Sequence, residues 1–200
     1  MGSLSLNLQN VRSRPETGKI YFRYSDIEVL PEYPITPLVE LLGGELFLVP
    51  SPSPRHQNIS RNIEFLMEGF LRKSKRGKVF DAPIDVQFTE EDVVVPDLVF
   101  VSNDKLGIIK EKNIRGVPDL IIEILSSNEK HDLQTKKKLY QKHGVQEYWI
   151  VDPKTETILL MRLQKGEYVT VGKYGKGKSV QPSIPALEGL TLSVDEIFEP

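Results

Sequence analysis

The chain has 200 residues, a length that fits one domain with a sizeable core. It contains no cysteine, which excludes disulfides and cysteine zinc sites. It also lacks an apolar run near 18 residues, so no transmembrane helix is expected. With 26 basic and 28 acidic residues, the chain does not have the strong positive charge of an avid DNA-binding protein. The absence of cysteine fits a reducing environment, so a cytoplasmic location is expected.

The N-terminal part predicts an arm followed by a hairpin. Residues 1–20 are expected to be a flexible arm, as chain ends often are, and residues 21–200 to form a single domain. A short helix is expected at Tyr24–Leu30. Further on, Leu38–Leu42 and Glu45–Val49 flank two glycines, a pair that suits a two-residue hairpin turn.

A long amphipathic helix follows the hairpin and is expected at His56–Arg72. Ser53 can cap it, with Pro54 at the first helical position. His56 lies on or near the inward side of this helix. It is either a core contact at the helix end or a residue that contacts substrate or supports the site.

The second half of the chain alternates between strands and helices. Two strands are expected to form an antiparallel pair, Val79–Phe88 and Val93–Val101, and a long polar connection with a short helix follows them. Further elements are a strand at Leu120–Leu125, a helix at Asp132–His143 that ends at Gly144, a strand at Glu147–Asp152, a hairpin of Thr157–Leu163 with Tyr168–Val171, and a closing strand with a helical turn. This order predicts an α/β fold with a mixed central sheet.

Two carboxylates occupy nearly continuous apolar runs. Asp97 lies within VVVPDLVFV and Glu123 within LIIEIL, and such runs are typical of strands buried on both faces. An unpaired ionised carboxylate is costly there. If the two strands pair, both acids can converge on one divalent cation with oxygen ligands. The alternative is that they are strand-end acids, capped by backbone N–H groups or paired with lysines.

A lysine from the following helix points toward the same place. At about 100° per residue, Lys136 falls within the apolar stripe of Leu139 and Tyr140, whereas Lys138 falls on the opposite face. Lys136 therefore points inward, with its ammonium free to reach a site. Alternatively it snorkels to solvent or pairs with Asp132 one helical turn away.

Several motifs together resemble a known family. VVPDLVFV, VPDLIIEIL, DLQTKKKLYQKHGVQEYWIVDP and the upstream GGELFLVPSPSPRHQ are similar to the Uma-type family of restriction endonucleases, within the PD-(D/E)xK nuclease superfamily. The resemblance runs from about Tyr24 to Phe198. It implies a restriction-endonuclease-like core and Mg²⁺- or Mn²⁺-dependent cleavage of phosphodiester bonds in DNA.

The resemblance also implies roles for individual residues. Asp97 and Glu123 are the two metal-binding acids, aided by a main-chain carbonyl near Ile124. The usual lysine of the superfamily would fall at position 125, which is Leu125 here, and Lys136 is the matching position on the next helix.

Three more residues match the family motifs. Glu45 is either a supplementary catalytic acid or a hairpin-end acid that faces water. His56 becomes a candidate for substrate contact or site support, and Glu147 a candidate that orients Lys136 or a water molecule.

Two other hypotheses are alternatives to a nuclease function. The mild acidity and the missing lysine at position 125 also suit a weak or inactive nucleic-acid-binding or interaction protein on the same fold. The other is a structural homodimer without affinity for nucleic acid, because exposed aromatic and apolar residues after Thr157 could support dimerisation.

Overall fold

A six-stranded mixed sheet forms the centre of the molecule, seen here in a computed structural model that describes residues 12–28, 38–126 and 130–200. The strand order is β13-β12-β11-β10-β8-β5, with β10 and β11 parallel and the other neighbours antiparallel. The strands are β5 (Gly77–Asp81), β8 (Leu98–Ser102), β10 (Leu120–Ile124), β11 (Glu147–Asp152), β12 (Thr157–Gln164) and β13 (Glu167–Tyr174). The sheet is mixed, as the sequence predicts.

A second, smaller sheet has the order β4-β3-β7-β6-β9. Its strands are β3 (Val39–Leu42), β4 (Glu45–Leu48), β6 (Val86–Gln87), β7 (Val93–Val94) and β9 (Ile114–Arg115). β3 and β4 form the predicted hairpin around Gly43 and Gly44, which both have positive φ. Two short pairs complete the strands: β1 (Arg12–Ser13) with β2 (Ile20–Tyr21), and β14 (Ser179–Val180) with β15 (Leu192–Ser193).

Two strands predicted as continuous are each divided between the two sheets. The run Val93–Val101 becomes β7 in the small sheet and β8 in the large one, separated by Pro96, and Val79–Phe88 becomes β5 and β6, separated by Pro83. Proline has no N–H to donate to the hydrogen bonds between strands, so each of these two segments leaves its first sheet near its proline. The predicted antiparallel pairing holds in both halves, since β5 pairs with β8 and β6 with β7.

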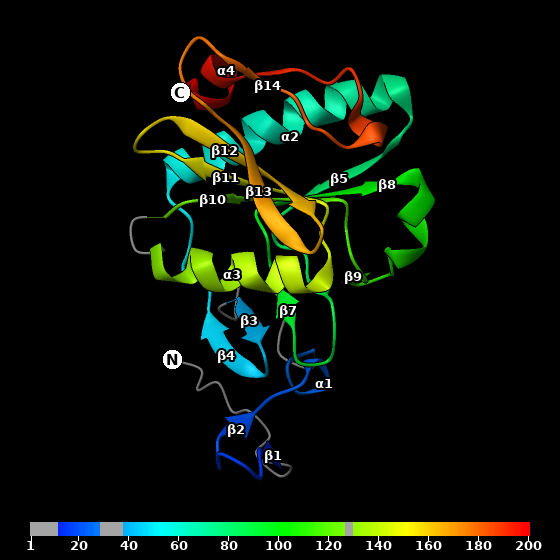
Figure 1. The fold of residues 1–200 in the computed structure, drawn as a ribbon, viewed down its shortest axis with the longest axis vertical. Coiled ribbons are helices and arrows are strands. Elements are labelled where there is room, and N and C mark those ends of the chain that lie inside the picture. Colours follow the sequence, from blue (N-terminus) through cyan, green and yellow to red (C-terminus); the bar gives the residue numbers. More distant parts are fainter. Residues whose placement is uncertain (1–11, 29–37, 127–129) are drawn as a thin grey trace.

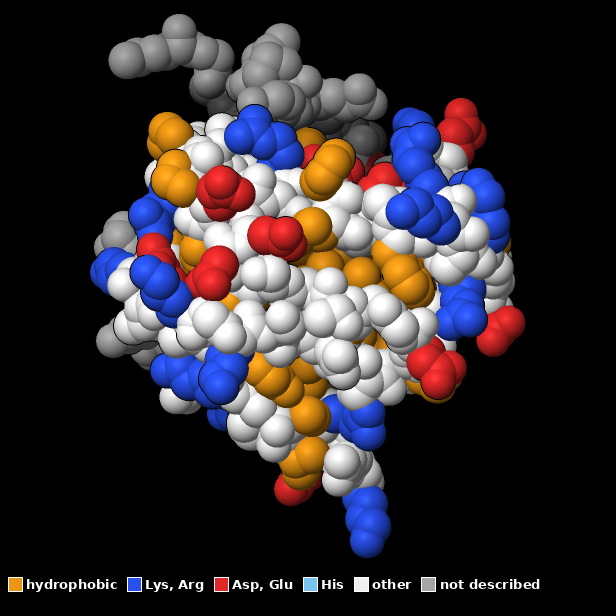
Figure 2. Space-filling view, turned by 90° about the horizontal axis from the view of Figure 1, so that it is seen from above, with side chains coloured by type: hydrophobic (Ala, Val, Ile, Leu, Met, Phe, Trp, Pro, Cys, Tyr) orange, Lys and Arg blue, Asp and Glu red, His pale blue; other side chains and the backbone are white. Residues whose placement is uncertain are grey.

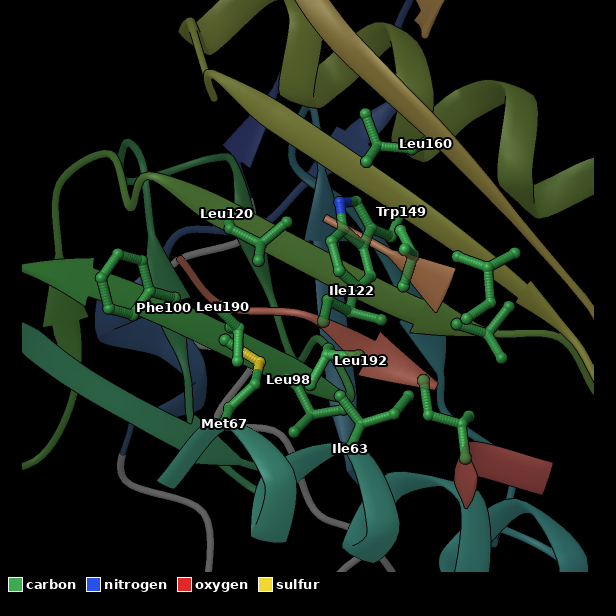
Figure 3. Close-up of a cluster of buried hydrophobic side chains, with 14 of the residues drawn as sticks. Ile63, Met67, Leu98, Phe100, Leu120, Ile122, Trp149, Leu160, Leu190 and Leu192 are labelled. Carbon is green, nitrogen blue, oxygen red and sulfur yellow. The ribbon is translucent and has the colours of Figure 1, made fainter. Parts of the chain in front are cut away.

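The long helix α2 (Pro54–Ser74) covers one face of the large sheet. The Ser53 hydroxyl accepts a hydrogen bond from the N–H of His56, so the predicted cap is confirmed. Figure 3 shows Ile63 and Met67 of this helix against side chains of β8, β10, β11 and β12. This core fixes the start of α2, and with it His56, relative to the central strands.

Helix α3 (Lys130–His143) covers the opposite face (Figure 1). Leu139 and Tyr140 are buried in a second core that includes Ile121 and Tyr148 of the large sheet and Val94 of the small one. Gly144, with φ of +83°, ends the helix as expected. The remaining helical segments are short: α1 (Tyr24–Ile27), η2 (Asn103–Ile108), η3 (Pro185–Leu187) and α4 (Val194–Phe198).

The N-terminal segment differs from the expected flexible arm. Residues 12–20 contain β1 and the first residue of β2, and Arg12 forms a 2.6 Å ion pair with Asp26. Residues 1–11, the rest of that predicted arm, lie outside the described residues. The described part of the arm is therefore tied to the domain.

The surface over α2 and α4 carries charges of both signs. Figure 2 shows basic and acidic side chains scattered over this face, with no continuous basic field. This face is therefore not a uniformly basic surface for a nucleic-acid backbone. In the part of the chain that the structure describes, no helix has the length and apolar character to cross a membrane.

Candidate active site

Asp97 and Glu123 lie side by side where β8 and β10 meet. These strands are antiparallel, with Leu98 opposite Ile122, so the next residues along, Asp97 and Glu123, become neighbours. Oδ2 of Asp97 accepts a 2.7 Å hydrogen bond from the main-chain N–H of Ile124. The convergence predicted for a pair of neighbouring strands is thus present.

Glu123 is buried, with 7% of its surface exposed. Its Oε1 accepts a 2.5 Å hydrogen bond from the Tyr140 hydroxyl and lies 3.2 Å from Nζ of Lys136. Burial raises the pKa of Glu123 above the usual range for glutamate, and the charges of Asp97 and Glu40 add to this effect, while the Lys136 ammonium opposes it. The carboxylate therefore needs positive charge nearby to stay ionised.

Lys136 supplies part of that charge from α3. Its side chain is only 10% exposed, and its Nζ lies between Glu123 and Glu40, 2.9 Å from Oε1 of Glu40. Lys138, two residues along, is exposed. The inward direction predicted for Lys136 from the helical face is therefore present, whereas the suggested partner Asp132 has a side chain outside the described residues.

His56, on helix α2, contacts Asp97. Its Nε2 is 3.2 Å from Oδ2 of Asp97, and the two side chains are 13% and 18% exposed. His56 lies in the first turn of α2, next to the Ser53 cap, and this position places its ring at the site. The structure thus places His56 in contact with a candidate metal-binding acid.

Glu45 does not join the cluster. It is exposed at the start of β4 and forms a 2.9 Å ion pair with Lys19. Glu40, on the other arm of the same hairpin, is the acid that reaches Lys136. The prediction that Glu45 is a supplementary site residue is therefore corrected: Glu40, and not Glu45, belongs to the cluster.

Glu147 is also away from Lys136. It begins β11 opposite Leu120, at the other end of β10 from Glu123. Its Oε2 accepts from the N–H and hydroxyl of Ser183, and its Oε1 accepts a 2.7 Å bond from Nε1 of Trp149. Burial raises its pKa, which these hydrogen bonds oppose. The predicted role in orienting Lys136 is therefore corrected to a buried structural one.

The short helix η2, in the predicted polar connection, also lies away from the site. Lys105 in η2 contacts Asp119, which directly precedes β10, with Nζ 2.9 Å from Oδ1. Asp119 and Glu123 are at opposite ends of that strand. This segment therefore supports the far end of the sheet.

Sequence reasoning missed two members of the cluster, Glu40 and Tyr140. Glu40 sits among apolar residues in VELL, the same pattern that singled out Asp97 and Glu123. Tyr140 lies four residues after Lys136, so both side chains share one face of α3. Applying the buried-acid criterion to every predicted strand would have found Glu40.

The oxygen atoms of the site suit a hard divalent cation. Asp97 and Glu123 each bind protein donors through one oxygen, and no hydrogen bond or ion pair within the described residues reaches Oδ1 of Asp97 or Oε2 of Glu123. The described residues contain no group of three or more His, Asp or Glu that could hold a metal by itself. Mg²⁺ is commonly held by one or two carboxylates, with water and phosphate oxygens completing the shell. The donor set therefore fits.

The fold and the acid pair define the class of protein: an α/β protein with a restriction-endonuclease-like core. The chain belongs to the Uma2 family, described as "Putative restriction endonuclease", whose family model matches residues 26–195. The resemblance noted in the sequence is confirmed. Membership of this family supports a nuclease function in general terms.

A solved structure has a similar fold. It is a crystal structure of a "putative nuclease belonging to DUF820" from Anabaena variabilis, with a TM-score of 0.71 and 23% sequence identity. The match covers 88% of this chain and 97% of that chain. No curated protein matches this chain. The structural likeness supports the fold assignment, at an identity too low to transfer residue roles.

Proposed function

We propose that the protein is a Mg²⁺- or Mn²⁺-dependent endonuclease that hydrolyses phosphodiester bonds in DNA. The observation that carries the proposal is the meeting of Asp97 and Glu123 from neighbouring strands, with the Lys136 ammonium 3.2 Å from the second acid. Two acids and a lysine at one point are the parts that metal-assisted phosphodiester hydrolysis needs.

The charge of the cluster also supports a divalent ion. Glu40, Asp97 and Glu123 are three carboxylates, and Lys136 is one ammonium among them. Among these described residues the acids outnumber the lysine, in a largely buried place. Neighbouring buried carboxylates repel one another when they are ionised, and a divalent cation would offset that repulsion.

Asp97, Glu123 and the main-chain carbonyl of Ile124 would hold such an ion. When bound, it would polarise the scissile phosphate and lower the pKa of an attacking water. The chain itself keeps the two acids in place, through the Ile124 N–H on Asp97 and the Tyr140 hydroxyl on Glu123. Both acids are thus oriented before substrate arrives.

Lys136 would orient the attacking water or stabilise the negative charge that develops on the phosphate. It takes the place of the lysine that position 125 lacks. His56 would hold Asp97 in one orientation through its Nε2 contact. Asp97 would then have a second contact that holds it in place, and small misplacements of a reacting group can cost much of the rate.

A binding protein without catalysis is the second candidate, favoured by the nearly balanced charge of the chain.

The homodimer stays a prediction. Val169 and Val171 on the edge strand β13 are among the exposed apolar residues after Thr157. The cytoplasmic location likewise stays a prediction.

Nicking of supercoiled plasmid in Mg²⁺ or Mn²⁺ tests the proposal. Wild type is expected to cleave, and Asp97→Asn and Glu123→Gln to lower the rate by about 100-fold or more, because each removes a metal-binding charge. Glu45→Gln is the matched control at an exposed glutamate and should cleave like wild type. Melting curves check that each variant is folded. Normal cleavage by Asp97→Asn would overturn the assignment, and no cleavage by wild type would favour the binding protein.

A further inference from the structure

Glu40 links the small sheet to the acid pair of the large sheet. It lies in the middle of β3 and is 2% exposed. Its Oε1 accepts a 2.9 Å hydrogen bond from the N–H of Val95 and lies 2.9 Å from Nζ of Lys136. Lys136 is therefore held between an acid of each sheet.

We propose that Glu40 is a positioning residue that keeps the Lys136 ammonium in the site when Glu123 is engaged by a divalent ion. The inference rests on the proposed function. It assigns Glu40 a task that differs from those of Asp97 and Glu123, because Glu40 acts on the lysine and not on the ion.

Glu40 and Glu123 compete for the ammonium of Lys136. In the structure its ammonium is shared by Glu40 and Glu123 at 2.9 and 3.2 Å. Once Glu123 shares its charge with a divalent ion, the attraction between Glu123 and Lys136 falls and the ion repels the ammonium. Glu40 then becomes the acid that retains Lys136 beside the substrate.

The anchoring of Glu40 suits this task. The N–H of Val95 fixes Oε1, the same oxygen that contacts Lys136. Val95 lies two residues before Asp97, in the link where the chain crosses from one sheet to the other. The anchor of the lysine is thus built into the segment that also positions the first acid.

Burial makes Glu40 and Lys136 dependent on one another. Glu40 is 3% exposed and Lys136 10% exposed as side chains, so removing one partner leaves a buried charge with less compensation. Residues that act as one unit give non-additive effects when both are changed. This property separates a positioning role from an independent one.

A double-mutant cycle of cleavage rates tests the proposal. Glu40→Gln should lower kcat by about 100-fold, the scale expected for a misplaced reacting group, with KM little changed. In a Lys136→Ala background the same change should have no further effect. Equal fold-losses in both backgrounds, or a Glu40→Gln enzyme with wild-type kcat, would overturn the proposal. Glu45→Gln is the control from the same hairpin.

Binding of Mn²⁺ by calorimetry separates the two possible roles of the acid. Glu40→Gln should bind Mn²⁺ within about twofold of wild type, whereas Asp97→Asn should lose measurable binding. If Glu40→Gln weakens Mn²⁺ binding as much as Asp97→Asn does, Glu40 is a ligand of the ion and the positioning role is wrong.

A stability cycle keeps the proposal testable without cleavage. Urea unfolding should show a smaller destabilisation by Glu40→Gln in a Lys136→Met background than in wild type. Equal destabilisation in the two backgrounds would contradict the pairing. A wild type that never cleaves would overturn the proposed function alone, because this cycle still reports on the pairing of Glu40 with Lys136.

Discussion

The main-chain N–H of Ile124 donates a 2.7 Å hydrogen bond to Oδ2 of Asp97, across the boundary between β8 and β10. Since Ile124 directly follows Glu123, this bond holds the carboxylate of Asp97 beside that of Glu123. Such preorganisation lowers the cost of bringing two like charges together when an ion binds.

Binding of a divalent ion should stabilise the folded protein. At about 100 times its Kd, a ligand adds about 2.7 kcal/mol, which corresponds to a rise in Tm of roughly 5–10 °C for a chain of this size. We expect Mn²⁺ to raise the Tm of wild type and of Glu45→Gln, but not that of Asp97→Ala. A thermal melt with and without Mn²⁺ measures this. An equal rise in Asp97→Ala would place the ion elsewhere.

The hydroxyl of Tyr140 should contribute to stability through Glu123. Tyr140→Phe removes the 2.5 Å hydrogen bond to Oε1 but keeps the ring beside Tyr148. Hydrogen bonds to charged groups contribute about 1.5–3 kcal/mol, so we expect a loss of that order in urea unfolding. Tyr174→Phe, at a partly buried tyrosine on β13, should change stability by less than about 0.5 kcal/mol. Similar small effects for both variants would contradict the proposed support of Glu123.

Asp92 should make stability depend on acid pH. It is buried and contacts Nζ of Lys142 at 2.8 Å, Nε2 of His143 at 2.7 Å and the N–H of Gly43 at 2.8 Å. Burial acts to raise its pKa, but these contacts outweigh burial and hold the pKa of Asp92 well below its usual range. The folded state therefore favours ionised Asp92, and its stabilisation is complete above about pH 4 and is lost as the pH falls further.

Asp92→Asn tests this dependence in urea unfolding from pH 7 down to pH 2. The difference in free energy of unfolding between wild type and the variant should shrink as the pH falls below about 4. A difference that stays constant over this range would show that the charge of Asp92 does not contribute as inferred.

Glu147 should matter for stability and not for cleavage. Glu147→Ala leaves the buried donors of Ser183 and Trp149 without their acceptor, at a cost of about 1–3 kcal/mol for each unsatisfied group. We expect a clear loss in urea unfolding and a nicking rate within about twofold of wild type at a temperature where the variant is folded. A folded Glu147→Ala protein that cleaves 100-fold more slowly would restore the role predicted from sequence.

The features that the sequence predicted correctly depend on local patterns. Acids within apolar strand runs singled out Asp97 and Glu123, and the 100° helical step pointed Lys136 inward. The Ser53 cap and the Gly43-Gly44 turn follow from the chemistry of those residues. Only the meeting of Asp97 and Glu123 also required two separate strands to pair, which the sequence analysis assumed and the structure shows.

The errors concern long-range placement. Pro96 inside VVVPDLVFV was a visible sign that the strand is interrupted, but only the assembled fold reveals a second sheet. The choice between Glu40 and Glu45 depends on which arm of the hairpin faces α3. The partner of Glu147 is Ser183, 36 residues away, and no short-range pattern connects them.

Plasmid nicking by Lys136→Ala, compared with Lys138→Ala on the exposed face of the same helix, tests the central claim most directly. In Mg²⁺ or Mn²⁺, Lys136→Ala should be about 100-fold slower than wild type, while Lys138→Ala should cleave at close to the wild-type rate. Equal, normal cleavage by both variants would contradict the claim that α3 supplies the lysine of a two-carboxylate nuclease site.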